Sequence, residues 1–239
     1  MTSTESKATS ASPASPSTSP SAPFPERLLK GYANFIAERF PAESARYKSL
    51  AATGQKPRTI VIACCDSRAA PETIFNAGPG ELFVVRNVAN LVPPYEPDGG
   101  NHSTSAALEF AVQSLKVESI LVLGHGRCGG IGAALNPGGE PLSPGDFIGK
   151  WMSPLTQAAT TVAANGDLTK QEQQTALERL SIRNSIANLR TFPNIKSLEE
   201  EGKISLHGAW FDISSGELWV LNSDTEEFTL APSGVVSEL

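Results

Sequence analysis

Cysteine and histidine side chains occur in two segments of the sequence that could bind one metal ion together. Cys-Cys-Asp-Ser-Arg occupies positions 64–68, and His-Gly-Arg-Cys occupies positions 125–128. Thiolate and imidazole are the preferred ligands of zinc, and three protein ligands leave a fourth position open to water, as in catalytic sites. Cys64, His125 and Cys128 therefore predict a catalytic site of the Cys2His type with one Zn²⁺ per chain.

Both segments follow short apolar runs that predict buried strands. Residues 59–64, 82–85 and 120–124 are rich in Val, Ile and Leu, as strands of a parallel sheet are. Helical patterns at 103–116 and 129–135 alternate with these runs, which indicates a parallel α/β sheet. Ligands of such sheets gather at the carboxyl ends of the strands, so we expect the two segments to meet there.

The rest of the chain extends this α/β prediction. Helices are expected at 151–164 and 168–190, and two late strands at 204–211 and 218–221 form a hairpin at the sheet edge. The predicted fold is a mostly parallel sheet of about four strands plus an antiparallel edge strand, flanked by helices. An apolar helix from residue 28 to Phe40, interrupted by Pro41 and followed by a short second helix, packs within the chain or, as we favour, on a partner subunit.

Composition excludes several classes of function. The 239 residues carry a net charge of −6 without a basic cluster, which argues against nucleic acid and anionic membranes as partners. Three cysteines form a poor disulfide framework, and no apolar run approaches a membrane span. We therefore expect a cytoplasmic protein.

The N-terminal segment differs from the rest in composition. Residues 1–25 are almost entirely Ser, Thr, Ala and Pro, so we expect them to be disordered, with one domain over 26–239. A transit peptide is the alternative interpretation of this Ser-rich segment. The absence of arginine from it argues for the first interpretation.

Three further side chains near these motifs need an interpretation. Cys65 is expected to face the core, because successive residues of a strand point to opposite faces. His207 is also assigned to the core. His102 is expected to be structural, with a proton shuttle as the alternative.

The combined motifs resemble a known family. Cys-x-Asp-Ser-Arg followed by His-x-x-Cys-Gly-Gly is similar to the signature of beta-class carbonic anhydrases, and residues 79–95 resemble the plant members. The resemblance implies a zinc lyase that interconverts carbon dioxide and bicarbonate through attack of zinc-bound hydroxide. It also implies a homodimer or larger homo-oligomer, with Cys64, His125 and Cys128 as the zinc ligands.

The resemblance further implies roles for individual residues. Asp66 and Arg68 match the catalytic dyad of the family, and Asp66 takes the fourth zinc position in the family's closed form. The substrate-binding positions of the family correspond to Gln55, Phe83, Val88, Phe110 and Gly129. Phe110 replaces a tyrosine of plant members, which removes a hydroxyl donor. Val61 stands where bicarbonate-regulated members carry tryptophan, which favours the subtype whose zinc is open to water.

Other functions remain compatible with the same motifs. The same zinc site could act on carbon disulfide or carbonyl sulfide. The zinc could also be structural in a non-catalytic subunit, although such a site has no need of Asp66 and Arg68. Redox sensing through Cys64 and Cys65 is disfavoured, because a disulfide between neighbouring residues is strained.

Overall fold

The structure is a computed structural model that describes residues 23–136, 138 and 140–232. Most of the segment predicted to be disordered, residues 1–22, lies outside the described residues. The chain divides into two compact units, one up to Lys48 and the other from Ser49 onwards. The prediction of a single domain over 26–239 stays a prediction. Within the described ranges no helix is long and apolar enough to cross a membrane.

The N-terminal helical segment is continuous through Pro41, contrary to the predicted interruption. It comprises α1 (Glu26–Asn34), the π-helical turn η1 (Phe35–Arg39) and α2 (Phe40–Thr53). Proline has no backbone N–H and clashes with the preceding turn of an α-helix. The wider π turn ends where the N–H of Phe40 bonds to the carbonyl of Phe35, directly before Pro41. This local widening accommodates the proline without ending the helix.

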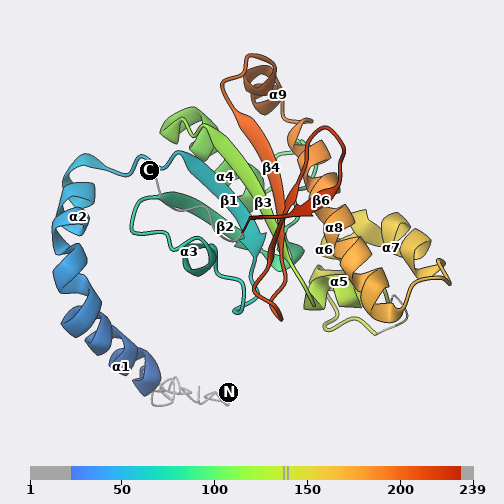
Figure 1. Ribbon diagram of the computed structural model, residues 1–239, viewed down its shortest axis with the longest axis horizontal. Coiled ribbons are helices and arrows are strands. Elements are labelled where there is room, and N and C mark those ends of the chain that lie inside the picture. The colour runs from blue at the N-terminus through green and yellow to red at the C-terminus, as the bar shows by residue number, and fades with distance from the viewer. Residues whose placement is uncertain (1–22, 137, 139, 233–239) are drawn as a thin grey trace, which may run out of the picture. The chain divides into compact units, whose positions relative to one another are not determined.

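A six-stranded sheet lies at the centre of the second unit (Figure 1). Its spatial order is β2-β1-β3-β4-β5-β6, in which β2, β1, β3 and β4 are parallel neighbours and β5 and β6 are antiparallel. The strands are β1 (Thr59–Cys64), β2 (Leu82–Asn87), β3 (Ser119–His125), β4 (Ser205–Phe211), β5 (Leu218–Leu221) and β6 (Phe228–Leu230). The predicted fold class and the edge hairpin are confirmed, and β6 adds an edge strand that was not predicted.

Helices connect and flank these strands. They are α3 (Pro71–Ile74), η2 (Val88–Asn90), α4 (Ser103–Glu109), η3 (Phe110–Leu115), α5 (Gly129–Ala134), α6 (Phe147–Met152), η4 (Ser153–Leu155), α7 (Thr156–Ala163), α8 (Lys170–Leu189) and α9 (Pro193–Glu200). The longest, α8, begins with a capping box in which Thr169 and Glu172 bond to each other's backbone N–H. It lies beside β3 and β4, where it shares the main core with α4 (Figure 1).

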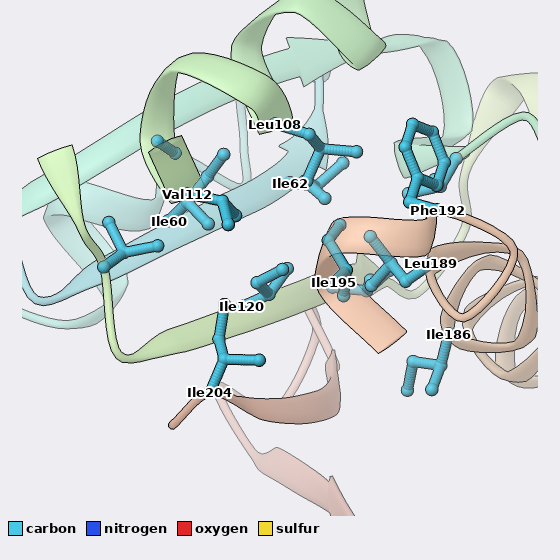
Figure 2. Close-up of a cluster of buried hydrophobic side chains, with 14 of the residues drawn as sticks. Ile60, Ile62, Leu108, Val112, Ile120, Ile186, Leu189, Phe192, Ile195 and Ile204 are labelled. Carbon is cyan, nitrogen blue, oxygen red and sulfur yellow. The ribbon is translucent and has the colours of Figure 1, made fainter. Parts of the chain in front are cut away.

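Alternating side chains of the central strands build a core on each face of the sheet. Ile60 and Ile62 of β1 belong to the main cluster, which Figure 2 shows between the sheet and its helices. Val61 and Ala63, one position along, belong to a separate cluster on the opposite face. Burial on both faces explains why these strands are continuously apolar rather than alternating in polarity. The sheet therefore fixes the carboxyl ends of β1 and β3 rigidly beside each other.

Candidate metal centre

The two cysteine- and histidine-bearing segments meet at the carboxyl ends of β1 and β3. Cys64 is the last residue of β1, His125 is the last of β3, and Cys128 directly precedes α5. All three side chains are buried, and their ligand atoms lie within 4.8 Å of one another. The two sulfur atoms are 3.9 Å apart. Because β1 and β3 are paired in parallel, residues sixty positions apart come to one point of the fold.

The imidazole of His125 is arranged as a metal ligand. Its Nδ1 lies 2.9 Å from the backbone oxygen of Gly126, so the Nδ1–H donates to that carbonyl and, in the neutral ring, Nε2 is the acceptor. Among the described residues, Nε2 is buried and has no hydrogen-bond partner. A buried acceptor without a partner is costly, whereas a metal ion would satisfy it.

The thiols of Cys64 and Cys128 are also suited to binding a cation. The hydrogen bond from the Cys128 thiol lowers the pKa of Cys64, and the same bond raises the pKa of Cys128. The backbone N–H of Ala89 donates to the Cys64 sulfur over 3.3 Å. One thiolate is therefore stabilised, and a second beside it needs a positive ion. Two thiolates and one imidazole are the donor set of a catalytic zinc site.

A carboxylate held by an arginine lies next to this group. Arg68 donates from Nε to Asp66 Oδ1 over 2.9 Å and from Nη2 to Oδ2 over 2.7 Å, a bidentate ion pair. These hydrogen bonds hold the pKa of Asp66 well below its usual range. Asp66 Oδ2 lies 3.8 Å from Nε2 of His125. Nη2 of Arg68 also donates to the carbonyl of Arg127, which ties the two segments together.

Arg86 supports the first segment, and sequence analysis assigned it no role. Its guanidinium donates to the carbonyl oxygen of Cys64 over 2.8 Å and to that of Asp66 over 2.6 Å. Arg86 stands in register with Ala63 on the neighbouring strand. The signal in the sequence is a charged residue directly after four apolar residues of the same strand.

The predicted substrate-binding residues occupy different surroundings. The rings of Phe83 and Phe110 pack with centroids 5.8 Å apart, and Phe110 is 48% exposed. Val88 directly follows β2 and precedes the residue that contacts the Cys64 sulfur, and Gly129 begins α5. Gln55 is exposed between α2 and β1, and its side chain makes no hydrogen bond within the described residues.

The predictions that Cys65 and His207 lie in the core are wrong. Cys65 is exposed rather than in the core, because β1 ends at Cys64 and the chain turns before the alternation can continue. His207 is also exposed, although it lies in β4, and its Nε2 is 2.8 Å from the hydroxyl of Ser205. His102 lies 2.6 Å from the carboxylate of the exposed Asp98.

The sequence did not predict a role for Glu178, a buried carboxylate that bonds to the backbone of Cys128. Glu178 of α8 is 2% exposed, and its oxygens accept hydrogen bonds from the backbone of Cys128 and the indole of Trp210. Burial raises the pKa of this carboxyl. The signal in the sequence is that Glu178 falls on the apolar stripe of α8, one turn before Ile182 and two before Ile186.

Comparison with known proteins gives consistent matches. The family model described as carbonic anhydrase matches residues 59–218. Beta carbonic anhydrase 6, mitochondrial, from Arabidopsis thaliana is 35% identical over 208 residues, covering 86% of this chain and 71% of the relative. The chain is therefore similar to this enzyme over most of both sequences.

Solved structures of the same kind share the fold. The beta-carbonic anhydrase CcaA superposes with a TM-score of 0.78 at 29% identity, covering 87% of this chain and 92% of the other. One of two tetrameric beta-carbonic anhydrases from Sordaria macrospora superposes with a TM-score of 0.72 at 29% identity, covering 82% and 95%. The family-model match over residues 59–218 includes β1 and β3, at whose ends the buried group lies.

Proposed function

The chain belongs to the beta-class carbonic anhydrase family, and we propose from this membership that it hydrates carbon dioxide reversibly with zinc held by Cys64, His125 and Cys128. The observation that carries the proposal is the buried Nε2 of His125, which has no partner among the described residues and lies beside two thiols. When bound, zinc would acidify a water molecule and so supply the hydroxide that attacks carbon dioxide.

In this proposal Asp66 accepts a hydrogen bond from the attacking hydroxide, which aims the oxygen lone pair at the carbon of the substrate. The bidentate bond from Arg68 keeps Asp66 ionised and would restrain it from binding the metal. Release of that bond would allow Asp66 to become the fourth ligand, and its Oδ2 already lies 3.8 Å from Nε2 of His125. Asp66 is therefore both a catalytic residue and a conditional ligand.

Apolar side chains lining the site can hold uncharged carbon dioxide but bind the anionic product, bicarbonate, only weakly. We assign this role to Phe83, Val88 and Phe110, of which Phe83 and Phe110 pack against each other. Gly129 would offer a backbone N–H, and Gln55 a polar side chain, to bicarbonate. Val61 is buried in β1 and supports the open-site, plant-type subtype, because it replaces the tryptophan of regulated members.

A homo-oligomer is the proposed state in solution. Four apolar side chains of the N-terminal helical segment are exposed by 40% or more: Leu28, Leu29, Tyr32 and Ile36. Exposed apolar surface on this scale is typical of a protein interface. The Sordaria macrospora relatives are tetrameric, which supports a partner of the same kind.

We also propose a cytoplasmic location, because the three cysteines form a poor disulfide framework and suit a reducing compartment. The plant relative is named as mitochondrial, so the proposal needs its own test. A fluorescent protein fused after residues 1–25 would remain in the cytosol if the proposal is correct. Import of the fusion into an organelle would contradict it.

Zinc content and hydration rates of wild type, Cys128→Ser and Cys65→Ser test the proposed reaction. We expect about one zinc per chain in wild type and Cys65→Ser, because Cys65 is exposed and outside the ligand group. Cys128→Ser removes one ligand and should lose both zinc and activity. Zinc without hydration, but with sulfide released from carbon disulfide, would favour the alternative substrate. Absence of zinc in wild type would contradict the proposed site.

A further inference from the structure

Glu178 has no part in the proposed reaction, yet its carboxylate is buried directly behind a proposed zinc ligand. Glu178 Oε1 accepts the backbone N–H of Cys128 over 2.9 Å and the side-chain amide of Gln174 over 3.1 Å. Glu178 Oε2 accepts the indole N–H of Trp210 over 3.0 Å. A carboxylate this deeply buried is costly unless its oxygens are satisfied, and three donors satisfy them here.

Two side chains of α8 form hydrogen bonds to the backbone of Cys128, one to its N–H and one to its carbonyl. Glu178 accepts the N–H of Cys128, and the amide of Gln174 donates to the Cys128 carbonyl over 3.1 Å. The preceding residue, Arg127, has a φ of +57°, in the left-handed region that non-glycine residues seldom adopt. A strained turn of this kind persists only where its surroundings hold it.

The opposite side of the Glu178 carboxylate is fixed by an indole that is itself held in place. Trp210 of β4 is 4% exposed and stands in register with Gly124 of β3. The guanidinium of Arg179 lies 4.7 Å from the ring centroid of Trp210 and 4.7 Å from that of Trp219. The sandwich fixes the plane of Trp210, and so aims its N–H at Glu178.

We propose that Glu178 is a positioning residue that holds the Cys128 turn in its ligand geometry, with Trp210 fixing the carboxylate from the other side. The inference rests on the proposed zinc site. A ligand held in place by hydrogen bonds loses less conformational freedom when the metal binds. Loss of the Glu178 carboxylate should therefore weaken zinc binding even though no ligand atom is changed.

A matched pair of tryptophan variants separates this role from general packing. Trp210→Phe and Trp219→Phe each remove an indole from the face of Arg179, but only Trp210 donates to Glu178. Trp219 donates instead to Glu217 over 3.3 Å. Glu178→Gln is the direct variant, because the carboxamide keeps the shape but turns one of the acceptor positions into a donor.

Zinc affinity, measured by competition with a chelator, is the main readout for the full-length variants. We expect affinity to fall about 10–100-fold in Glu178→Gln and less strongly in Trp210→Phe, while Trp219→Phe stays within about twofold of wild type. Cobalt(II) substituted for zinc gives a second readout, since a displaced Cys128 sulfur changes the visible absorption spectrum of the ion. Thermal unfolding checks that each variant is folded.

The outcomes separate this inference from the proposed function. Tight zinc binding in wild type together with unchanged affinity in Glu178→Gln would overturn the positioning role and leave the zinc site intact. Equal affinity in Trp210→Phe and Trp219→Phe would overturn the part assigned to Trp210. Absence of zinc from wild type would overturn both. If Glu178→Gln does not fold, the two tryptophan variants decide the question by themselves.

Discussion

The side chain of Arg68 donates to both carboxylate oxygens of Asp66, and the backbone N–H of Arg68 donates to Oδ1 as well. Only the side-chain bonds engage Oδ2, the oxygen that lies nearer to His125. Arg68→Ala should free Asp66 to approach the metal position and lower the rate of carbon dioxide hydration by about 10–100-fold. Stopped-flow hydration measures the rate, and metal analysis should find unchanged zinc. Arg58→Ala removes an exposed arginine that is paired with Glu118 and is the matched control. Full activity in Arg68→Ala would contradict the restraining role.

The donor set predicts how hydration depends on pH. In the proposed site two thiolates would cancel the formal charge of Zn²⁺, so the ion would stabilise hydroxide less than it would with three neutral imidazoles. The active, deprotonated form is then reached at higher pH, and activity should rise from about pH 6.5 towards about pH 9. The pH profile of kcat/KM in zinc-loaded wild type checks this, with Cys65→Ser expected to give the same profile. A profile that falls with pH would contradict the expected ionisation.

At the scale of residues, the sequence predicted those functional side chains whose residue type and spacing are typical of a metal site. Cys64, His125 and Cys128 could be recognised because each lies at or just after the end of a strand and each offers a metal-binding atom. Cys65 and His207 were assigned to the core wrongly, because strand alternation does not say where a strand stops or which face is covered. Glu178 was missed because its role depends on a contact between α8 and the Cys128 turn.

The position of α8 on the sheet depends on a glycine. A Cβ atom on Gly208 of β4 would lie 2.8 Å from Ile182 Cγ2, 3.0 Å from Ile186 Cδ1 and 3.0 Å from Leu221 Cδ2. Gly208→Ala would therefore overpack the interface between β4 and α8 and lower the free energy of unfolding by about 1–3 kcal/mol. Denaturant unfolding measures the loss.

Gly166→Ala is the control for this change, since a Cβ there meets no atom within 4 Å. Because α8 carries Glu178, the Gly208→Ala variant should also bind zinc more weakly. Equal stability of the two variants would show that α8 can move away from the sheet at little cost.

At the scale of elements, buried strands and the longer helices could be predicted because their apolar patterns are continuous. β6 was missed, since it has three residues and one partly buried side chain, Phe228, which is too short for a period to be visible. The continuity across Pro41 was missed for another reason. A π turn relieves the proline by shifting backbone hydrogen bonds, and that shift has no residue pattern of its own.

At the scale of the whole molecule, the apolar pattern of an amphipathic helix does not say which protein surface its apolar face packs against. The apolar spacing in the N-terminal helical segment is the same whether the helix packs on its own chain or on another copy. The described chain forms two units, of which the first has no buried residue in α1. The assembly therefore has to be tested by experiment, and the exposed side chains of this segment give the means.

Replacing Tyr32 and Ile36 together by serine removes two of the exposed apolar side chains of this segment, which are 64% and 40% exposed. If the segment packs on a partner subunit, the double variant should sediment as a smaller species than wild type, because the apolar area that drives association is lost. Lys30→Ser is the control, since Lys30 pairs with Glu26 over 2.8 Å at an exposed position. Packing within the chain predicts a different result, namely an unchanged mass with a lower free energy of unfolding. A monomeric wild type would contradict the proposed oligomer directly.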